Sequence, residues 1–145
     1  MRKSKKRSGA NSGPLPEEPT LFLDRSLGRN VVADRLRAEG MAVEIHDDHL
    51  AQDAPDEEWI ALVGRRRWVA VTKDRNIRYR AGELEAVRRN AARVLVLRMK
   101  DATGAEMAAL LIRARRRLAR FASRTPAPFV AGIARTGSIA RYDTL

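Results

Sequence analysis

Short apolar runs alternate with amphipathic stretches along the chain from residue 21 onward. Residues 68–71, Trp-Val-Ala-Val, contain no polar position, which is typical of a parallel strand covered on both faces. Residues 21–23 and 94–97 are also short and apolar, and residues 41–45 are apolar except for Glu44. We expect a strand in each of these four segments.

The stretches between the strands carry the signals of helices. Residues 27–39 place apolar side chains on one face, with Ser26 as the expected N-terminal cap and Gly40 as the stop. Acids follow Pro55 and arginines end the same stretch, which is the charge order that a helix dipole favours. Two more helices are predicted over residues 83–89 and 103–123, the second opened by a capping box of Thr103 and Glu106.

The alternation of strands and helices predicts an α/β domain of three layers, with helices on both faces of a central parallel sheet of about four strands. Polar loops are expected over residues 46–53 and 73–82. Residues 129–142 predict a C-terminal β-hairpin around Gly137. The pattern leaves open whether this hairpin pairs with the sheet or with another chain.

Composition narrows the class of protein. The chain has 145 residues, 44% of them apolar, and lacks cysteine, which excludes disulfides and thiolate metal sites. Residues 1–20 are rich in Pro, Gly and Ser, so we expect a flexible basic arm before a single domain of residues 21–145. No apolar run approaches the roughly 20 residues that cross a bilayer, and no secretory signal is evident. We expect a soluble cytoplasmic protein that does not bind membranes.

The net charge of +11 points to a polyanionic partner. Residues 1–20 contain five Lys or Arg and two Glu, which leaves +8 for the rest of the chain. Such a field favours nucleic acid through phosphate neutralisation. An acidic protein partner, or simple solubility, would account for the same charge.

Carboxylates follow two of the predicted strands. Asp24 comes directly after residues 21–23, and Asp74 comes shortly after residues 68–71. The carboxyl ends of parallel strands lie along one edge of a sheet, so we expect these side chains to converge, joined by Asp56 or Glu57 from the next helix start. Clustered carboxylates repel one another and are stabilised by Mg²⁺ or Mn²⁺, which could assist phosphodiester hydrolysis.

Three segments in this order resemble the acidic motifs of PIN-like domains, most closely the compact group that includes VapC-like toxins of toxin–antitoxin pairs. The segments are Phe22-Leu23-Asp24, Pro55-Asp56-Glu57-Glu58 and Val71-Thr72-Lys73-Asp74-Arg75-Asn76, within a similarity over roughly residues 21–100. The resemblance implies a Mg²⁺- or Mn²⁺-dependent ribonuclease that a cognate antitoxin silences. The implied catalytic residues are Asp24, Asp56, Glu57 and Asp74.

By the same resemblance Asp24, Asp56 and Asp74 are metal ligands, and the Thr72 hydroxyl orients a neighbouring carboxylate. Asn76 stands where many relatives have a further Asp. Its amide oxygen can still coordinate a cation, but it adds no charge, so metal affinity would be lower or activity lost.

The loop after Asp74 is expected to bind RNA. Arg75, Arg78 and Arg80 could hold phosphates, and Tyr79 could stack on an unpaired base. A solvated basic loop would have the same composition.

Each acidic residue also has an ordinary structural interpretation. Asp24 could be a turn or cap residue, Asp74 an exposed turn carboxylate, and the acids after Pro55 dipole-favoured residues. Residues 46–49, His-Asp-Asp-His, contain metal-ligating types, but four adjacent residues rarely share one ion, and a solvated loop is expected.

The sequence supports two classes of function. The first is a metal-dependent endoribonuclease that acts as a toxin and cleaves RNA. Its expected partners are an antitoxin protein and a second copy of the chain in a homodimer. The second is a catalytically weak or inactive module of the same fold that binds RNA or protein, a hypothesis that Asn76 favours. Cleavage of DNA instead of RNA stays open, because no reader of the 2′-hydroxyl is identifiable.

Overall fold

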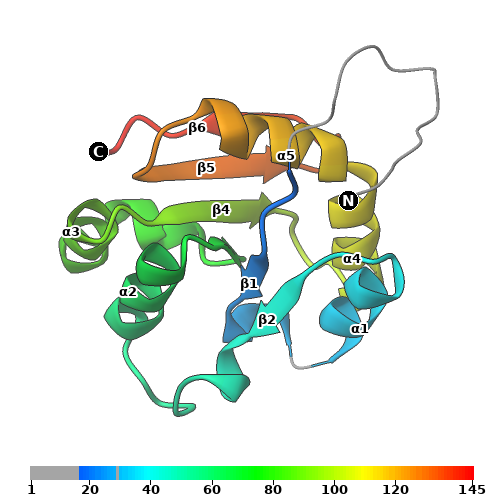
Figure 1. Cartoon of the computed structure of the whole chain (residues 1–145), viewed down its shortest axis with the longest axis horizontal. Helices are drawn as coiled ribbons and strands as arrows, with labels where there is room; N and C mark the ends of the chain where they lie inside the picture. Colours follow the sequence, from blue (N-terminus) through cyan, green and yellow to red (C-terminus); the bar gives the residue numbers. More distant parts are fainter. Residues whose placement is uncertain (1–16, 29) are drawn as a thin grey trace.

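A six-stranded sheet forms the centre of the computed structural model, which describes residues 17–28 and 30–145 (Figure 1). The first sixteen residues of the predicted arm therefore lie outside the described residues. The strands are ordered β2-β1-β3-β4-β5-β6, and all neighbours are parallel except β5 and β6. Their bounds are β1 Leu21–Leu23, β2 Val43–Ile45, β3 Val69–Thr72, β4 Arg93–Arg98, β5 Phe129–Ala134 and β6 Ile139–Arg141.

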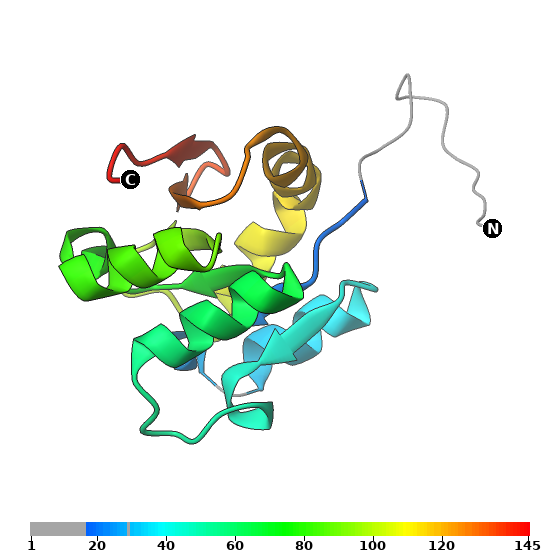
Figure 2. The same ribbon diagram turned by 60° about the vertical axis from the view of Figure 1, so that its left-hand side comes forward.

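Helices cover both faces of this sheet (Figures 1 and 2). Helices α1, α4 and α5 pack on one face and α2 and α3 on the other, each layer with its own apolar cluster. The α/β/α fold class is thus confirmed. The helix bounds are α1 Val31–Ala38, α2 Asp56–Arg66, α3 Ala81–Arg89, α4 Gly104–Arg113 and α5 Arg115–Arg124.

The two-residue period of the strands assigns side chains to the two layers. In β3, Val69 and Val71 contact the α1, α4 and α5 layer, whereas Ala70 contacts the α2 and α3 layer. All four residues of this strand are at most 1% exposed, as predicted for a strand covered on both faces. Phe22 of β1 likewise contacts the α2 and α3 layer, and by the same alternation Thr72, at the end of β3, faces that layer.

The C-terminal hairpin extends the sheet. Strand β5 pairs in parallel with β4, and β6 returns antiparallel through a turn in which Gly137 has φ +94°. The predicted hairpin and its turn are confirmed, and they add two strands to the four expected.

Two predicted helices are wrong in extent. In place of one helix over residues 27–39, the chain forms a 3₁₀ turn, Arg25–Leu27, then Gly28 at φ +84°, and only then α1. Ser26 bonds to Asp24 instead of capping α1, because the 3₁₀ turn separates it from that helix. Gly40, at φ +79°, does lie at the C-terminal end as expected.

The segment 103–123 forms two helices that meet at Ala114, where the backbone leaves helical geometry at φ −96°, ψ 7°. The capping box of Thr103 and Glu106 is present as predicted. Arg115, just after the break, donates to both carboxylate oxygens of Glu18 at 2.7 Å and to the Glu39 carbonyl at 2.9 Å. These are contacts between segments far apart in the chain, so helical periodicity carries no sign of the break.

The two polar loops contain short helical turns. Residues His46–Asp48 and Arg75–Tyr79 form 3₁₀ helices, and α3 begins at Ala81, two residues earlier than predicted. Within residues 17–28 and 30–145, no helix has both the length and the apolar character that a membrane span requires.

Helices α2 and α3 approach each other closely at Gly64. A Cβ atom added there would lie 2.2 Å from the Asn90 carbonyl oxygen and 2.9 Å from the Asn90 Cβ. No side chain fits this space, so only glycine allows the two helices to lie at this distance.

We predict that Gly64→Ala lowers the free energy of unfolding by about 1–3 kcal/mol, the usual cost of overpacking, measured by urea denaturation. Gly82→Ala is the matched control, because its Cβ would meet only the flexible end of Glu57, at 3.3 Å. Alanine is favoured over glycine inside helices by up to about 1 kcal/mol, so the control should be neutral or stabilising. Equal stability of the two variants would contradict the close contact.

Candidate metal centre

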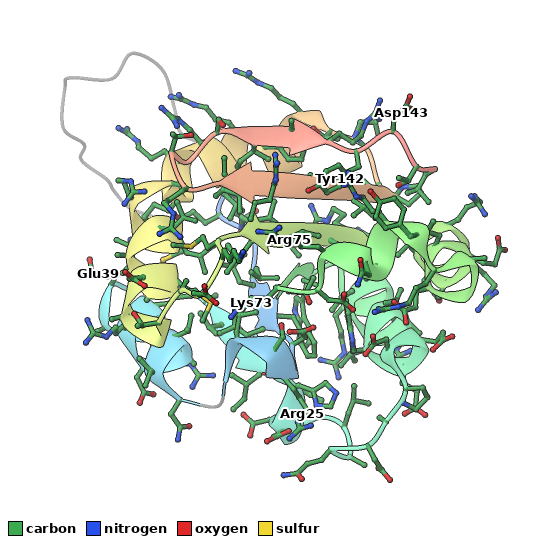
Figure 3. The ribbon with its side chains drawn as sticks, turned by 180° about the vertical axis from the view of Figure 1, so that it is seen from behind. Arg25, Glu39, Lys73, Arg75, Tyr142 and Asp143 are labelled. Atoms are coloured by element: carbon green, nitrogen blue, oxygen red, sulfur yellow. The ribbon has the colours of Figure 1, made fainter. Side chains whose placement is uncertain are left out.

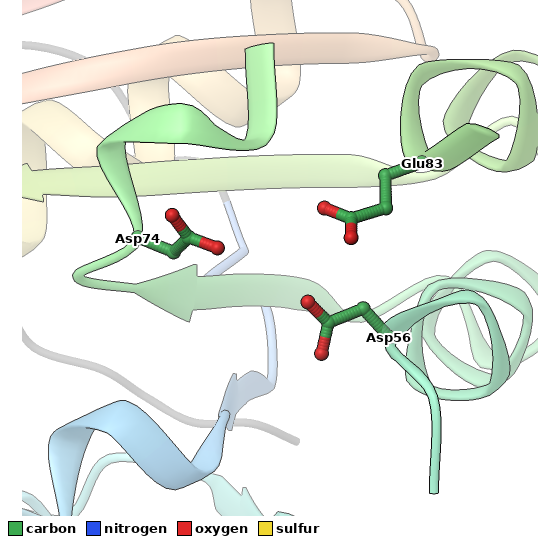
Figure 4. A group of neighbouring side chains, drawn as sticks. All are labelled: Asp56, Asp74 and Glu83. Carbon is green, nitrogen blue, oxygen red and sulfur yellow. The ribbon is translucent and has the colours of Figure 1, made fainter. Parts of the chain in front are cut away.

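Three carboxylates converge at the carboxyl edge of the sheet. Asp56 is the first residue of α2, Asp74 follows β3, and Glu83 lies in the first turn of α3. One oxygen from each lies within 4.8 Å of the others, and the three side chains point into a common space (Figure 4). All three are partly buried.

The chain path explains this convergence. Helix α2 precedes β3 and α3 precedes β4, and both strands are parallel, so both helices run back against the sheet. Their N-termini therefore lie at the edge where β1 and β3 end. A helix N-terminus also favours a carboxylate through its dipole, which suits Asp56 and Glu83.

Asp24 lies in the same cleft, outside that group of three. The cleft has a volume of about 230 Å³, and Asp24, Asp56 and Asp74 are among the residues that line it. Asp24 is only 7% exposed and accepts hydrogen bonds from the Ser26 backbone N–H at 2.9 Å, the Ser26 hydroxyl, and the Thr72 hydroxyl at 2.6 Å. Burial raises the pKa of Asp24, these hydrogen bonds oppose the rise, and the nearby charge of Asp56 adds to it.

Thr72 connects two of the predicted site residues. Its Oγ1 donates to Asp24 and accepts from the backbone N–H of Asp74 at 3.0 Å. Thr72 is fully buried at the end of β3. The hydroxyl thus orients a neighbouring carboxylate, which is the kind of contact that the sequence motif led us to expect.

Arg80, the N-cap residue of α3, pairs with two of the converging carboxylates. Its Nη1 contacts Asp74 and lies 3.2 Å from Glu83 Oε1. Burial is the main cause of the raised pKa of Glu83, which the Arg80 contact opposes and the charges of Asp56 and Asp74 increase. Asp56 accepts a hydrogen bond from the Trp59 indole at 3.0 Å.

The other predicted acidic and amide residues lie at the margin of this cluster. Glu57 is exposed and its Oε2 lies beside Gly82, at the start of α3. Asn76 is also exposed, and its backbone N–H donates to Asp74 Oδ1 at 3.0 Å.

The residues expected to bind RNA lie in or beside the 3₁₀ turn after Asp74. Arg75 is exposed, and Figure 3 shows it with Arg25 and Lys73, which follow the ends of β1 and β3. The Arg78 guanidinium lies 4.7 Å from the centre of the Tyr79 ring and 4.2 Å from that of Tyr142 (labelled in Figure 3). Tyr79 is 67% exposed, so its ring is open to a stacking partner.

Two residues of the site were not predicted from the sequence. Glu83 was assigned only to a helix start, yet the earlier beginning of α3 places it in the first turn, facing Asp56 and Asp74. The signal available was an acid close to the N-terminus of a helix that follows the third motif. His46 was expected in a solvated loop, but it is 3% exposed and lines the cleft, because its 3₁₀ turn folds it toward Phe22.

Comparison with known proteins agrees with this geometry. Neither the search of curated proteins nor the search of solved structures gave a match. Residues 19–99 match the family described as PIN like domain, a stretch that contains Asp24 and the three converging carboxylates. PIN domains are generally nucleases and typically bind divalent metal ions. From the match over more than half of its length, together with the α/β/α fold, the chain belongs to the PIN-like domain family.

Proposed function

We propose that this protein is a metal-dependent endoribonuclease that hydrolyses RNA phosphodiester bonds. The observation that carries the proposal is the convergence of Asp56, Asp74 and Glu83 within 4.8 Å in a PIN-like domain. Asp24 lines the same cleft as Asp56 and Asp74, and Thr72 joins it to the Asp74 backbone.

The donor set fits Mg²⁺ or Mn²⁺. It consists of carboxylate oxygens, which hard divalent ions prefer, and contains no sulfur. Among the described residues, the ion pairs of these three carboxylates come from the guanidinium of Arg80, which contacts two of them. The cluster thus carries an excess of negative charge, and the pKa of Glu83 is raised first by burial and then by the charges of Asp56 and Asp74.

Asp56, Asp74 and Glu83 would hold the ion, with Asp24 and the Asn76 amide oxygen as further oxygen donors at the margin. When bound, the ion supplies a water of lowered pKa and stabilises negative charge on the phosphate. Burial, and after it the charges of Asp56 and Asp74, raise the pKa of Glu83, and a bound cation would oppose that rise. Glu57, whose Oε2 lies beside Gly82 at the start of α3, would be a further acidic group near the cluster.

The loop after Asp74 would bind the RNA chain. Arg75 and Arg78 can contact phosphates, and the exposed ring of Tyr79 can stack on an unpaired base. Arg78 contacts the rings of both Tyr79 and Tyr142, and the second contact links this loop to the residue that follows β6. The basic character of the chain adds an attraction for phosphate that salt weakens.

The VapC-like character of the three motifs supports a role as the toxin of a toxin–antitoxin pair. Its partners would be an antitoxin protein that blocks the cleft, and a second copy of the chain. Expression of the chain with and without a candidate antitoxin, encoded by the neighbouring coding sequence, would test this part of the proposal. The two readouts are cell growth and the amount of RNA that stays intact.

A catalytically weak or inactive RNA- or protein-binding module is the second candidate. Two observations favour it: Asn76 brings no negative charge for a metal ion, and Arg80 already pairs with two of the carboxylates. Such a module would bind RNA in a salt-dependent manner and leave it intact with or without metal.

We predict that Asp74→Asn lowers RNA cleavage in Mn²⁺ by at least about 100-fold, since loss of one group that stabilises transition-state charge typically has an effect of this size. The readout is cleavage of a labelled single-stranded RNA, with the matching DNA as a second substrate. EDTA should abolish wild-type cleavage. Asp34→Asn, an exposed change on α1 on the opposite face of the sheet, is the control and should retain full activity.

Cleavage that persists in EDTA, or that Asp74→Asn leaves unchanged, would contradict a metal-dependent nuclease. Binding without cleavage in the wild type would establish the second candidate. Cleavage of the DNA substrate alone would replace RNA as the substrate.

We also predict a pH-dependent gain in stability for Asp24→Asn in metal-free buffer with EDTA. Because burial raises the pKa of Asp24 in the folded state, its ionisation favours the unfolded chain as the pH rises through that pKa. Asparagine does not titrate, so the free energy of unfolding of the variant, relative to wild type, should increase from pH 4 to pH 7. Urea denaturation at each pH measures the difference, and a gain that decreases with pH would contradict the raised pKa.

A further inference from the structure

Arg80 is positioned as a cation within the carboxylate cluster. Its Nη1 contacts Asp74 Oδ2 and Glu83 Oε1, and it lies between an acid that follows β3 and an acid of α3. The other oxygen of Asp74 accepts the Asn76 backbone N–H at 3.0 Å. Both oxygens of Asp74 are therefore engaged before any ion is considered.

We propose that Arg80 is the residue that sets the metal affinity of this site, because its guanidinium and the divalent ion compete for Asp74 and Glu83. The proposal rests on the metal site of the proposed function. In the metal-free protein Arg80 relieves the repulsion between the two carboxylates, and metal binding displaces it.

The chemistry of the guanidinium makes the competition direct. It has five N–H donors and no acceptor, so it cannot become a ligand itself. An ion on Asp74 Oδ2 at the usual 2.0–2.6 Å would share that oxygen with a second positive charge, and the two cations repel each other. Arg80 is 44% exposed on its side chain, so solvent can receive the displaced guanidinium.

Displacement would change the role of the arginine. Released from Asp74 and Glu83, the guanidinium stays attached at the N-cap of α3, beside the cleft and close in the chain to Arg78. It would then be free to contact an RNA phosphate. Metal and RNA would thus favour each other's binding, which is reciprocal by linkage.

A purely structural ion pair predicts different behaviour. If Arg80 only tied the 3₁₀ turn to α3, its loss would lower stability by the same amount with and without metal. If Arg80 competes with the ion, its loss lowers stability only in EDTA. In the presence of metal, the bound ion offsets the charges of Asp74 and Glu83 in place of the guanidinium.

The test is Mn²⁺ titration calorimetry on the full chain, together with thermal unfolding in EDTA and in saturating Mn²⁺. Arg80→Gln should bind Mn²⁺ about tenfold more tightly than wild type, within the range of ordinary coupling between two binding events. Its melting temperature should fall in EDTA and match wild type in Mn²⁺. Arg80→Lys should have an affinity between the two, since an ammonium keeps the charge but lacks the planar fork.

Arg88→Gln is the matched control. Arg88 also pairs with a glutamate of α3, Glu85, three residues away on an exposed surface. Its replacement should leave Mn²⁺ affinity unchanged and produce no metal-dependent difference in melting temperature.

Unchanged or weaker Mn²⁺ binding by Arg80→Gln would overturn the proposal, as would an equal loss of melting temperature in both buffers. If these results came with RNA cleavage that needs Mn²⁺, the nuclease function would stand and only the role of Arg80 would fall. If neither wild type nor Arg80→Gln bound Mn²⁺, both proposals would fall together.

Discussion

Mutual repulsion among carboxylates at one edge of the sheet is the constraint on which the proposed chemistry depends. Asp56, Asp74 and Glu83 converge within 4.8 Å, and burial withdraws water that would otherwise screen them. A fold tolerates such a cluster where something cationic offsets it. Arg80 does so partly here, and a divalent ion would complete the balance.

The packing of the helices on the sheet holds these acids in place against their repulsion. The close contact of α2 with the end of α3 at Gly64 sets the distance between two helices whose N-termini carry Asp56 and Glu83. Buried apolar side chains of both helices form one cluster with even-numbered positions of β1, β3 and β4. Hydrophobic burial far from the cleft thus supports the unfavourable electrostatics within it.

A chain of hydrogen bonds beneath the cleft adds local rigidity. Ser26 and Thr72 both donate to Asp24, and each also accepts a backbone N–H, from Lys73 at 2.9 Å and from Asp74 at 3.0 Å respectively. The ends of β1 and β3 are thereby joined through side chains as well as through the sheet. Fixed carboxylates favour a small ion with strict geometric demands, since little reorganisation accompanies binding.

The sequence alone was sufficient for the alternation of strands and helices, the three-layer fold, the hairpin turn at Gly137 and the family, because these depend on local hydrophobic patterns and short motifs. Tertiary structure decided the rest. The break at Ala114, the burial of His46 and the addition of Glu83 to the cluster depend on contacts between segments far apart in the chain. The pairing of Arg80 with Asp74 and Glu83 is of the same kind: composition showed a basic loop, but only the fold determined that one of its arginines faces the acids.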